Sequence, residues 1–292
     1  MCTVTFIPRR EGYLLAMNRD EKITRGQATP PTVVEIGAVR VLYPRDVQGG
    51  TWIAASSRGI VFALLNWNDS GVVQPKTRSR GCVIPALMGC KSIRNADAIL
   101  KRFDFQGILP FRLVGLFPSE RQMAEWRWDQ DSLICEGFAW DSRQWCSSSL
   151  SDAQATMRRG LAHARAQREG HVNSVTCLRR LHASHDQEDP AFSTCVHRQD
   201  VETVSYTELL CTPHRVQCHY RRGSPCGRNA GLHSIAIHRH GCTDVTGLRI
   251  AHLQAETTLI GTSPVSGVAR HPPVSWSVNL IKRQTTSASR VI

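Results

Sequence analysis

The sequence predicts an α+β fold, because runs with strand patterning and runs with helical spacing follow one another in blocks. Three pairs of short apolar runs open the chain, and helical, strand, helical and strand blocks come after them. Two helical layers over a double antiparallel sheet are one economical packing of this order. A single mixed sheet with helices is the alternative. The chain of 292 residues, 41% of them hydrophobic, suffices for a buried core.

The first block contains six strand patterns joined by turn-forming residues. Pro8 to Gly12 has the composition of a hairpin loop, and Gly37 separates the next pair in the same manner. Gly49-Gly50 and Arg58-Gly59 precede the last two runs, whose largely apolar composition suits strands covered on both faces. The six predicted strands are Thr3–Ile7, Tyr13–Met17, Thr32–Ile36, Val39–Tyr43, Thr51–Ala55 and Ile60–Trp67.

Four helical segments are expected further along. Cys82–Cys90 is the first, and Ala96–Phe103 is the second, with Asn95 as its N-cap. Ser151 or Asp152 is the expected N-cap of the third, and Asn173 is the expected N-cap of the fourth. Their proposed apolar faces consist of Met157, Leu161 and Ala164 in the third and Val175, Leu178 and Leu181 in the fourth.

The remaining strand patterns flank the last two helices. They are Phe111–Phe117, Arg121–Trp128, Ser132–Phe138, Phe192–His197, Val201–Tyr206 and Arg215–Tyr220. After Cys226 the periodicity weakens, and His, Ser, Thr, Gly and Pro become frequent. We therefore predict one domain over residues 1–226 and an irregular, basic, His-rich C-terminal tail over residues 227–292.

Composition limits the compartment and the class of partner. There is no run of 18 apolar residues, so we expect no membrane span, and Arg9, Arg10 and Glu11 interrupt any secretory leader. Eleven cysteines without a C-x-x-C pair suit small buried hydrophobes in a reducing compartment, so we predict a cytoplasmic protein. The net charge of +12 would allow nucleic-acid binding, but no aromatic-interleaved basic stripe accompanies it, and nucleic acid is an unlikely partner.

The second residue carries the strongest chemical signal. If Met1 is removed, Cys2 presents a thiol and a free α-amine on one residue. An α-amine with a pKa of about 7.7–8.0 can accept the thiol proton near neutral pH, so the pair is a self-contained nucleophile.

The surrounding motifs identify a resemblance. The chain resembles the NRDE family of transport and Golgi organisation proteins and their bacterial relatives, over roughly residues 1–226. The resemblance rests on Cys2, on the tetrad Asn18-Arg19-Asp20-Glu21, on Gly49-Gly50-Thr51-Trp52 and on the run from Arg58 to Asn66. The segments Phe192–Arg198 and Val204–Glu208 resemble the bacterial members near their C-terminal end.

That family is in turn similar to N-terminal nucleophile hydrolases such as choloylglycine hydrolase and penicillin V acylase. The resemblance implies a four-layer αββα sandwich in which Cys2 begins a central strand and Arg19 and Asp20 lie close to it. An arginine near the thiol favours the thiolate, and a carboxylate can hold the α-amine. Asn66 matches a position that helps to form the oxyanion hole in the hydrolases. Ser148 stands where the family places a second asparagine, and Arg198 is a candidate for the later arginine.

Each of these residues also has a purely structural interpretation. Arg19 and Asp20 could form an ion pair at a strand end, and Asn66 could satisfy a turn. Glu21 suits the ordering of the following loop, and Gly49 to Trp52 indicates a tight approach with a buried tryptophan.

Metal and cofactor motifs are weak in this sequence. Cys211, His214, Cys218 and His219 offer soft ligands, but their spacing matches no usual zinc pattern, and the group at His233, His238, His240 and Cys242 is no stronger. We predict no metal ligands and no cofactor.

The leading hypothesis is therefore an N-terminal cysteine nucleophile acting on an amide or thioester, as a hydrolase or acyltransferase, with a small-molecule substrate. The alternative is a non-catalytic binding or trafficking protein for a hydrophobic ligand such as a lipid, acyl-CoA or haem. The substrate and the oligomeric state stay open.

Overall fold

Two antiparallel sheets organise the part of the chain that the computed structural model describes, which is residues 2–68, 77–169, 174–227 and 231–239. These residues belong to one unit, Met1–Thr258, and the second unit, Leu259–Ile292, lies outside the described residues. The first sheet has the strand order β10-β1-β2-β11-β12-β13, and the second runs from β3 to β9 in sequence order.

The first sheet combines strands from both ends of the described chain. Its strands are β1 (Cys2–Pro8), β2 (Tyr13–Lys22), β10 (Arg143–Ser147), β11 (Val201–Cys211), β12 (Arg215–Arg222) and β13 (Leu232–His238). The second sheet is continuous in sequence. Its strands are β3 (Thr29–Ile36), β4 (Val39–Arg45), β5 (Ile53–Ser56), β6 (Val61–Asn66), β7 (Phe111–Phe117), β8 (Gln122–Trp128) and β9 (Leu133–Ala139).

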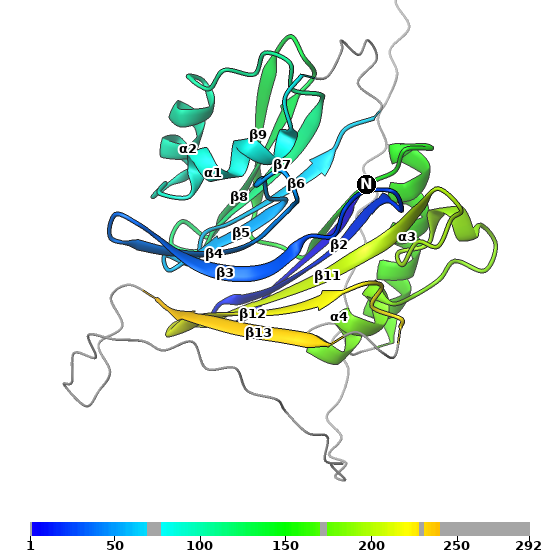
Figure 1. Ribbon diagram of the computed structural model, residues 1–292. Helices are drawn as coiled ribbons and strands as arrows, with labels where there is room; N and C mark the ends of the chain where they lie inside the picture. Colours follow the sequence, from blue (N-terminus) through cyan, green and yellow to red (C-terminus); the bar gives the residue numbers. More distant parts are fainter. Residues whose placement is uncertain (1, 69–76, 170–173, 228–230, 240–292) are drawn as a thin grey trace, which may run out of the picture. The chain divides into compact units, whose positions relative to one another are not determined.

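Helices cover the outer face of each sheet. The helical elements are the 3-10 turns η1 (Arg80–Cys82) and η2 (Pro190–Phe192) and the helices α1 (Val83–Leu87), α2 (Ile93–Leu100), α3 (Asp152–Arg168) and α4 (Val175–His182). Figure 1 shows α1 and α2 beside the second sheet and α3 and α4 beside the first. Serine side chains cap three of these helices, because Ser92, Ser151 and Ser174 each accept a main-chain N–H from the first turn.

Three apolar clusters hold the layers together. The largest combines the inward residues of both sheets, including Val4 and Met17 from the first and Ala63 and Val114 from the second. A second cluster joins the outer face of the second sheet to α1 and α2, and a third joins Leu14 and other outer residues of the first sheet to α4. The predicted four-layer αββα sandwich is thereby confirmed, and the single-sheet alternative is wrong.

β1 is buried on both faces, and its side chains point alternately toward the second sheet and toward the helices. Cys2, Val4 and Phe6 lie in the inter-sheet cluster, so Thr3 and Thr5 point toward the helices. The hydroxyls of both threonines have polar partners on that side, from α3 and α4 respectively. Burying hydroxyl groups without such partners would cost free energy.

Several sequence expectations fail in detail. The segment predicted as a strand at Phe192–His197 forms the end of η2 and a loop, with only an isolated bridge from His197 to Glu202. Ser92 rather than Asn95 caps α2, and Asn173 lies outside the described residues. The proposed apolar face of α3 is wrong, because Met157 and Leu161 are exposed.

The first sheet also extends past the predicted domain boundary. β13 pairs with β12 within the segment that was expected to be irregular. Only Ile237 of this strand is fully buried, so the alternation that marks a strand in sequence is weak there. The boundary at residue 226 and the character of the tail beyond β13 stay predictions. Within the described helices, none has both the length and the apolar character needed to cross a membrane.

Candidate active site around Cys2

Cys2 is the first residue of β1 and lies between β10 and β2 at the end of the first sheet. It is directly opposite Ser147 on one side and Arg19 on the other. Directly opposed residues of an antiparallel pair project to the same face, so all three side chains start on the inter-sheet face. The Cys2 side chain belongs to the inter-sheet cluster and is 5% exposed.

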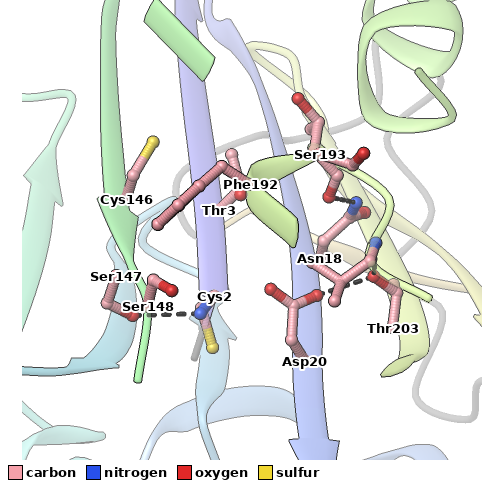
Figure 2. Close-up of polar contacts among 12 residues, drawn as sticks. Cys2, Thr3, Asn18, Asp20, Cys146, Ser147, Ser148, Phe192, Ser193 and Thr203 are labelled. Carbon is pink, nitrogen blue, oxygen red and sulfur yellow. Dashed lines mark hydrogen bonds between the residues drawn. The ribbon is translucent and has the colours of Figure 1, made fainter. Parts of the chain in front are cut away.

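The main chain of Cys2 is held on both sides. Its nitrogen donates a hydrogen bond to the Ser147 hydroxyl at 3.0 Å, as Figure 2 shows. Its carbonyl oxygen accepts one from the guanidinium of Arg159 at 3.3 Å. The nitrogen that would become the α-amine therefore has a neighbouring hydroxyl that can orient it.

The charge environment of the thiol is mixed. Burial raises the pKa of the Cys2 thiol, the negative charge of Asp20 raises it further, and the positive charge of Arg19 lowers it. Arg80 on η1 is a second nearby cation: burial lowers its pKa, and the Cys2 thiolate opposes that shift. A thiolate at this position therefore depends on its cationic neighbours.

Trp52 and Glu21 fix the position of Arg19. The guanidinium lies 4.2 Å from the centre of the Trp52 ring, and its Nη2 is 3.3 Å from Glu21 Oε2. Burial lowers the pKa of Arg19, and Glu21 and Cys2 raise it. The tryptophan of the predicted Gly-Gly-Thr-Trp motif is thus buried beneath the arginine of the tetrad.

The two motifs are also joined through a chain of ion pairs. Glu21 is 2.8 Å from Arg25, and Arg25 is 3.0 Å from Asp46. Asp46 in turn accepts the main-chain N–H of Gly50 at 2.9 Å. Glu21 therefore orders the loops beside the site, in agreement with the structural interpretation of this residue.

Gly50 allows the close approach that the motif predicted. A Cβ atom at this position would lie 3.0 Å from the Cα atom of Gly81, and the next residue, Thr51, donates its N–H to the Gly81 carbonyl at 3.1 Å. This contact holds η1, and with it Arg80, beside the loop that ends in Trp52.

Asn18 points to the opposite face of β2 and acts as a structural link. Its amide nitrogen donates to the carbonyls of His182 and Thr194, both at 2.8 Å. Its oxygen lies 3.1 Å from Nδ1 of His182, whose Nε2 lies 3.0 Å from the Thr5 hydroxyl. Burial lowers the pKa of His182 to about 3, so the imidazole is neutral.

Asp20 and Arg159 form a buried pair behind Cys2. Asp20 Oδ1 accepts a hydrogen bond from Thr203 at 2.7 Å, and Asp20 Oδ2 is 3.6 Å from Arg159 Nη2. Arg159 also donates to the Thr3 hydroxyl at 2.8 Å and to the Ser147 carbonyl at 3.3 Å. Figure 2 shows Asp20, Thr203 and Cys2 around this point. Asp20 is therefore close to the start of β1, and its carboxylate contacts Thr203 of β11 and Arg159 of α3.

Arg159 is a buried residue of the site that the helical periodicity did not predict. The stripe that α3 buries consists of Asp152, Ala155 and Arg159, at spacings of three and four residues. An arginine on such a stripe is normally assigned to solvent. The only signal in the sequence was the small Ala155 between two ionisable residues.

Ser148 follows β10, and Asn66 ends β6. The Ser148 hydroxyl accepts the N–H of Leu150 at 3.2 Å, so it closes a local turn, and the contact with Cys2 comes from its neighbour Ser147. Asn66 is the half-buried last residue of β6, and the pleat places it on the face of Leu64, toward α1. Their roles at an oxyanion stay predictions.

Asn68 and Asp152 tie these two segments together, and neither was expected. The Asn68 side-chain nitrogen donates to the Ser148 carbonyl at 2.9 Å and to Asp152 at 3.1 Å. Asp152 also accepts the Ser148 N–H at 2.7 Å. Arg198, the other arginine candidate, pairs with Asp200 at 3.0 Å and donates to Ser149 at 3.0 Å.

Two hollows in the described surface lie away from Cys2. One of about 560 Å³ is lined by Pro8 to Glu11, and another of about 540 Å³ is lined by Glu11, His238 and the turn between β11 and β12. Both are at the opposite end of β1 from Cys2, so neither identifies a substrate.

Comparison with known proteins supports the sequence resemblance. The model of the family "Transport and Golgi organisation 2" matches residues 1–127, which include every motif from Cys2 to Asn66, and the match ends before the expected limit at residue 226. No curated protein matches the chain at a significant level.

Two solved structures are similar to this chain at low identity. Penicillin V acylase from Agrobacterium tumefaciens is 11% identical, with 80% of this chain and 86% of that chain covered and a TM-score of 0.48. A mutant of the conjugated bile acid hydrolase from Clostridium perfringens is 9% identical, with 89% and 97% covered and a TM-score of 0.48.

Proposed function

From the match of residues 1–127 to the Transport and Golgi organisation 2 family, taken with the geometry at Cys2, we propose a cytoplasmic enzyme with an N-terminal cysteine nucleophile. Its reaction is attack on the carbonyl carbon of an amide or thioester, ending in hydrolysis or acyl transfer. The observation that carries the proposal is the anchoring of Cys2: its nitrogen is 3.0 Å from the Ser147 hydroxyl, and Arg19 lies opposite it in register.

The proposed reaction begins after removal of Met1. The α-amine of Cys2 accepts the thiol proton, and the thiolate forms a bond to the carbonyl carbon. The bond to the amine or thiol leaving group then breaks, and the leaving group takes the proton from the α-ammonium group. Water attacks the resulting acyl-thioester in a hydrolase, and an acceptor amine or thiol attacks it in a transferase.

Each neighbouring residue has a proposed role in this sequence. Ser147 orients the α-amine, and Arg19 favours the thiolate against the pKa-raising effect of burial. Ser148 would donate to the oxyanion, where one donor contributes about 2.7–4 kcal/mol to the barrier. Asn66, which the pleat of β6 places toward α1, would act as a second donor only with its side chain turned around the end of the strand. Asp20 and Arg159 are positioning residues that hold the start of β1. The two cations Arg19 and Arg80 suit a substrate with an anionic group, such as an acyl-CoA thioester.

The first test compares thiol reactivities within one molecule. The intact mass of the protein made in cells shows whether Met1 is absent, and limited alkylation at neutral pH followed by peptide mapping ranks the cysteines. Cys135 is exposed and Cys2 is buried, so a faster reaction at Cys2 reports activation rather than access. We expect Cys2 to react first, and Arg19→Gln to slow it without slowing Cys135. An amide and thioester screen with wild type and Cys2→Ser follows.

A non-catalytic function is the second candidate, favoured by the burial of the Cys2 thiol and the resulting rise in its pKa. In this case the site binds a hydrophobic ligand such as a lipid, acyl-CoA or haem. Retained Met1, a Cys2 no faster than Cys135, and saturable binding of acyl-CoA or haem without turnover would together select this function over the enzyme.

A further inference from the structure

Two cysteines and two histidines meet at one point between α4, β11 and β12. They are His185, Cys195, His197 and Cys226, and their ligand atoms all lie within 4.8 Å of one another. His185 follows α4, Cys195 and His197 lie in the loop before β11, and Cys226 follows β12. These residues are separate from the soft-ligand group at Cys211 to His219 that the sequence suggested.

The distances between the donor atoms fit a tetrahedral metal. The two sulfurs are 3.6 Å apart, and Nε2 of His197 is 3.5 Å from the sulfur of Cys195 and 3.2 Å from that of Cys226. Zn–S bonds of about 2.3 Å and Zn–N bonds of about 2.0–2.1 Å at tetrahedral angles place two sulfurs about 3.8 Å apart and a sulfur and a nitrogen about 3.6 Å apart. The three donor atoms of Cys195, His197 and Cys226 are therefore spaced close to the edges of a coordination tetrahedron, and the donor atom of His185 lies within 4.8 Å of them.

We propose that His185, Cys195, His197 and Cys226 bind one zinc ion. Two thiolates and two imidazoles are a donor set that zinc takes in structural sites, where all four positions are filled by the protein. Two thiolates neutralise the charge of Zn²⁺, so the site requires no further acidic residue in this basic chain. Binding releases the thiol protons to solvent.

The surrounding main chain holds the ligands in place without the metal. Cys195 donates its N–H to the carbonyl of Ser184, the residue before His185, at 3.0 Å. The Ser224 hydroxyl lies 3.5 Å from the Cys226 sulfur. The thiol donates to this hydroxyl, and a metal-bound thiolate at Cys226 would instead accept from it, as outer partners of metal ligands do.

The turn that carries Cys226 is also fastened to the sheet. Arg221 of β12 donates to the carbonyls of Pro225 at 3.3 Å and of Gly227 at 2.8 Å. His185, His197 and Cys226 are exposed, so an ion can reach the site from solvent.

The zinc ion would also stabilise the loop that supports β1 and β2 on the helix-facing side of the first sheet. The loop that carries Cys195 also supplies the Ser193 carbonyl to Arg159 at 3.1 Å and the Thr194 carbonyl to Asn18 at 2.8 Å. A zinc ion would lock this loop to α4 and to the turn after β12. The role is structural, and it holds whether or not Cys2 is catalytic.

Metal content of the purified full chain tests the proposal. The protein is made without a histidine tag, purified in the presence of a phosphine reductant and without chelator, and measured by mass spectrometry for zinc, copper, iron and nickel. We expect about one zinc per chain, as for a closed four-ligand site. Cys226→Ser and His185→Ala should lose the zinc, because each removes a ligand. Both residues are exposed, so their replacement leaves the core intact.

Two variants serve as matched controls. Cys135→Ser removes an exposed cysteine of β9, and His214→Ala removes an exposed histidine of the rejected ligand group; both should retain zinc. Reconstitution of the chelated wild type with Co²⁺ should give the visible absorption of a tetrahedral thiolate complex, and Cys226→Ser should not. Chelator should lower the melting temperature of wild type but not of Cys226→Ser.

Other results would overturn the proposal. These are substoichiometric zinc in wild type with no cobalt spectrum on reconstitution, zinc retained in both Cys226→Ser and His185→Ala, a different metal at full occupancy, or a Cys195–Cys226 disulfide that persists with reductant and excludes Zn²⁺.

Discussion

Replacing Arg159 with methionine is expected to be the most destabilising single change in the described part of the sandwich among those that leave its apolar core intact. The side chain is 1% exposed and lies 3.6 Å from Asp20, which is equally buried. Methionine fills much of the same volume but leaves the carboxylate without this guanidinium. Removing one partner of a buried ion pair costs about 3–5 kcal/mol.

Because Arg159 also makes several hydrogen bonds, the cost of breaking the ion pair is a lower estimate of the stability lost. Five acceptors face its nitrogens within 3.3 Å, namely the carbonyls of Cys2, Ser147, Phe192 and Ser193 and the hydroxyl of Thr3. A buried polar group left unsatisfied costs about 1–3 kcal/mol, although such costs are not additive within one network. We therefore expect a loss of at least 3 kcal/mol in the free energy of unfolding, on the scale of a buried charge pair.

Urea denaturation of wild type, Arg159→Met, Asp20→Asn and the double variant measures the loss and the coupling. The double variant should lose less than the sum of the single losses, because the Asp20→Asn change removes the buried charge that Arg159→Met alone would leave without its partner. Arg158→Met is the matched control: this neighbour pairs with Glu188 at the surface, so its unfolding free energy should stay close to wild type. A loss below about 1 kcal/mol for Arg159→Met would refute the reasoning, since that is the range of a surface pair.

Two further predictions concern His182 and Gly50. Burial holds the pKa of His182 near 3 in the folded protein, against about 6.5 in an unfolded chain, so the unfolded state binds one more proton between these values. The free energy of unfolding should therefore fall as the pH drops below 6.5. His182→Gln should reduce the slope of this free energy against pH by up to about 1.36 kcal/mol per pH unit. An unchanged slope in urea titrations at several pH values would contradict this. Gly50→Ala should lower the free energy of unfolding by about 1–3 kcal/mol, because its Cβ meets the Gly81 main chain at 3.0 Å. The control Gly89→Ala, whose Cβ would have no atom within 4 Å, should not lower it. Equal melting temperatures for the two variants would argue against the close approach.

Periodicity and turn residues were sufficient to predict the layers of the fold. The apolar runs from Thr3 to Asn66 predicted strands, and the burial of β1, β2, β5 and β6 on both faces is what a double sheet covered by helices requires. The edge strand β3 is largely exposed. The spacing between Cys2 and the tetrad predicted one hairpin, and the register places Arg19 opposite Cys2. Local patterns determine these features, because each depends on residues near one another in sequence.

The polar interior could not be predicted in this way. Periodicity assigned Met157 and Leu161 to the core of α3, but the structure buries Arg159, since acceptors from Cys2, Ser147 and Phe192 converge on that side. Those acceptors are up to 157 residues away in sequence. A buried arginine is stable only where such partners exist, and no local pattern shows them.

Cys2, the tetrad, the strands β1 to β9 and the four helices follow from the sequence by itself, because composition, spacing and alternation express them directly. The strands β10 and β13 do not. Only the tertiary structure decided that Ser147 rather than Ser148 contacts Cys2, that Asn18 joins β2 to α4, and that four metal-binding side chains meet at Cys195. Each of these depends on which loops the packed sheets bring together. Contacts between distant segments are set by the fold as a whole, and a single sequence records them only as scattered polar residues without a period.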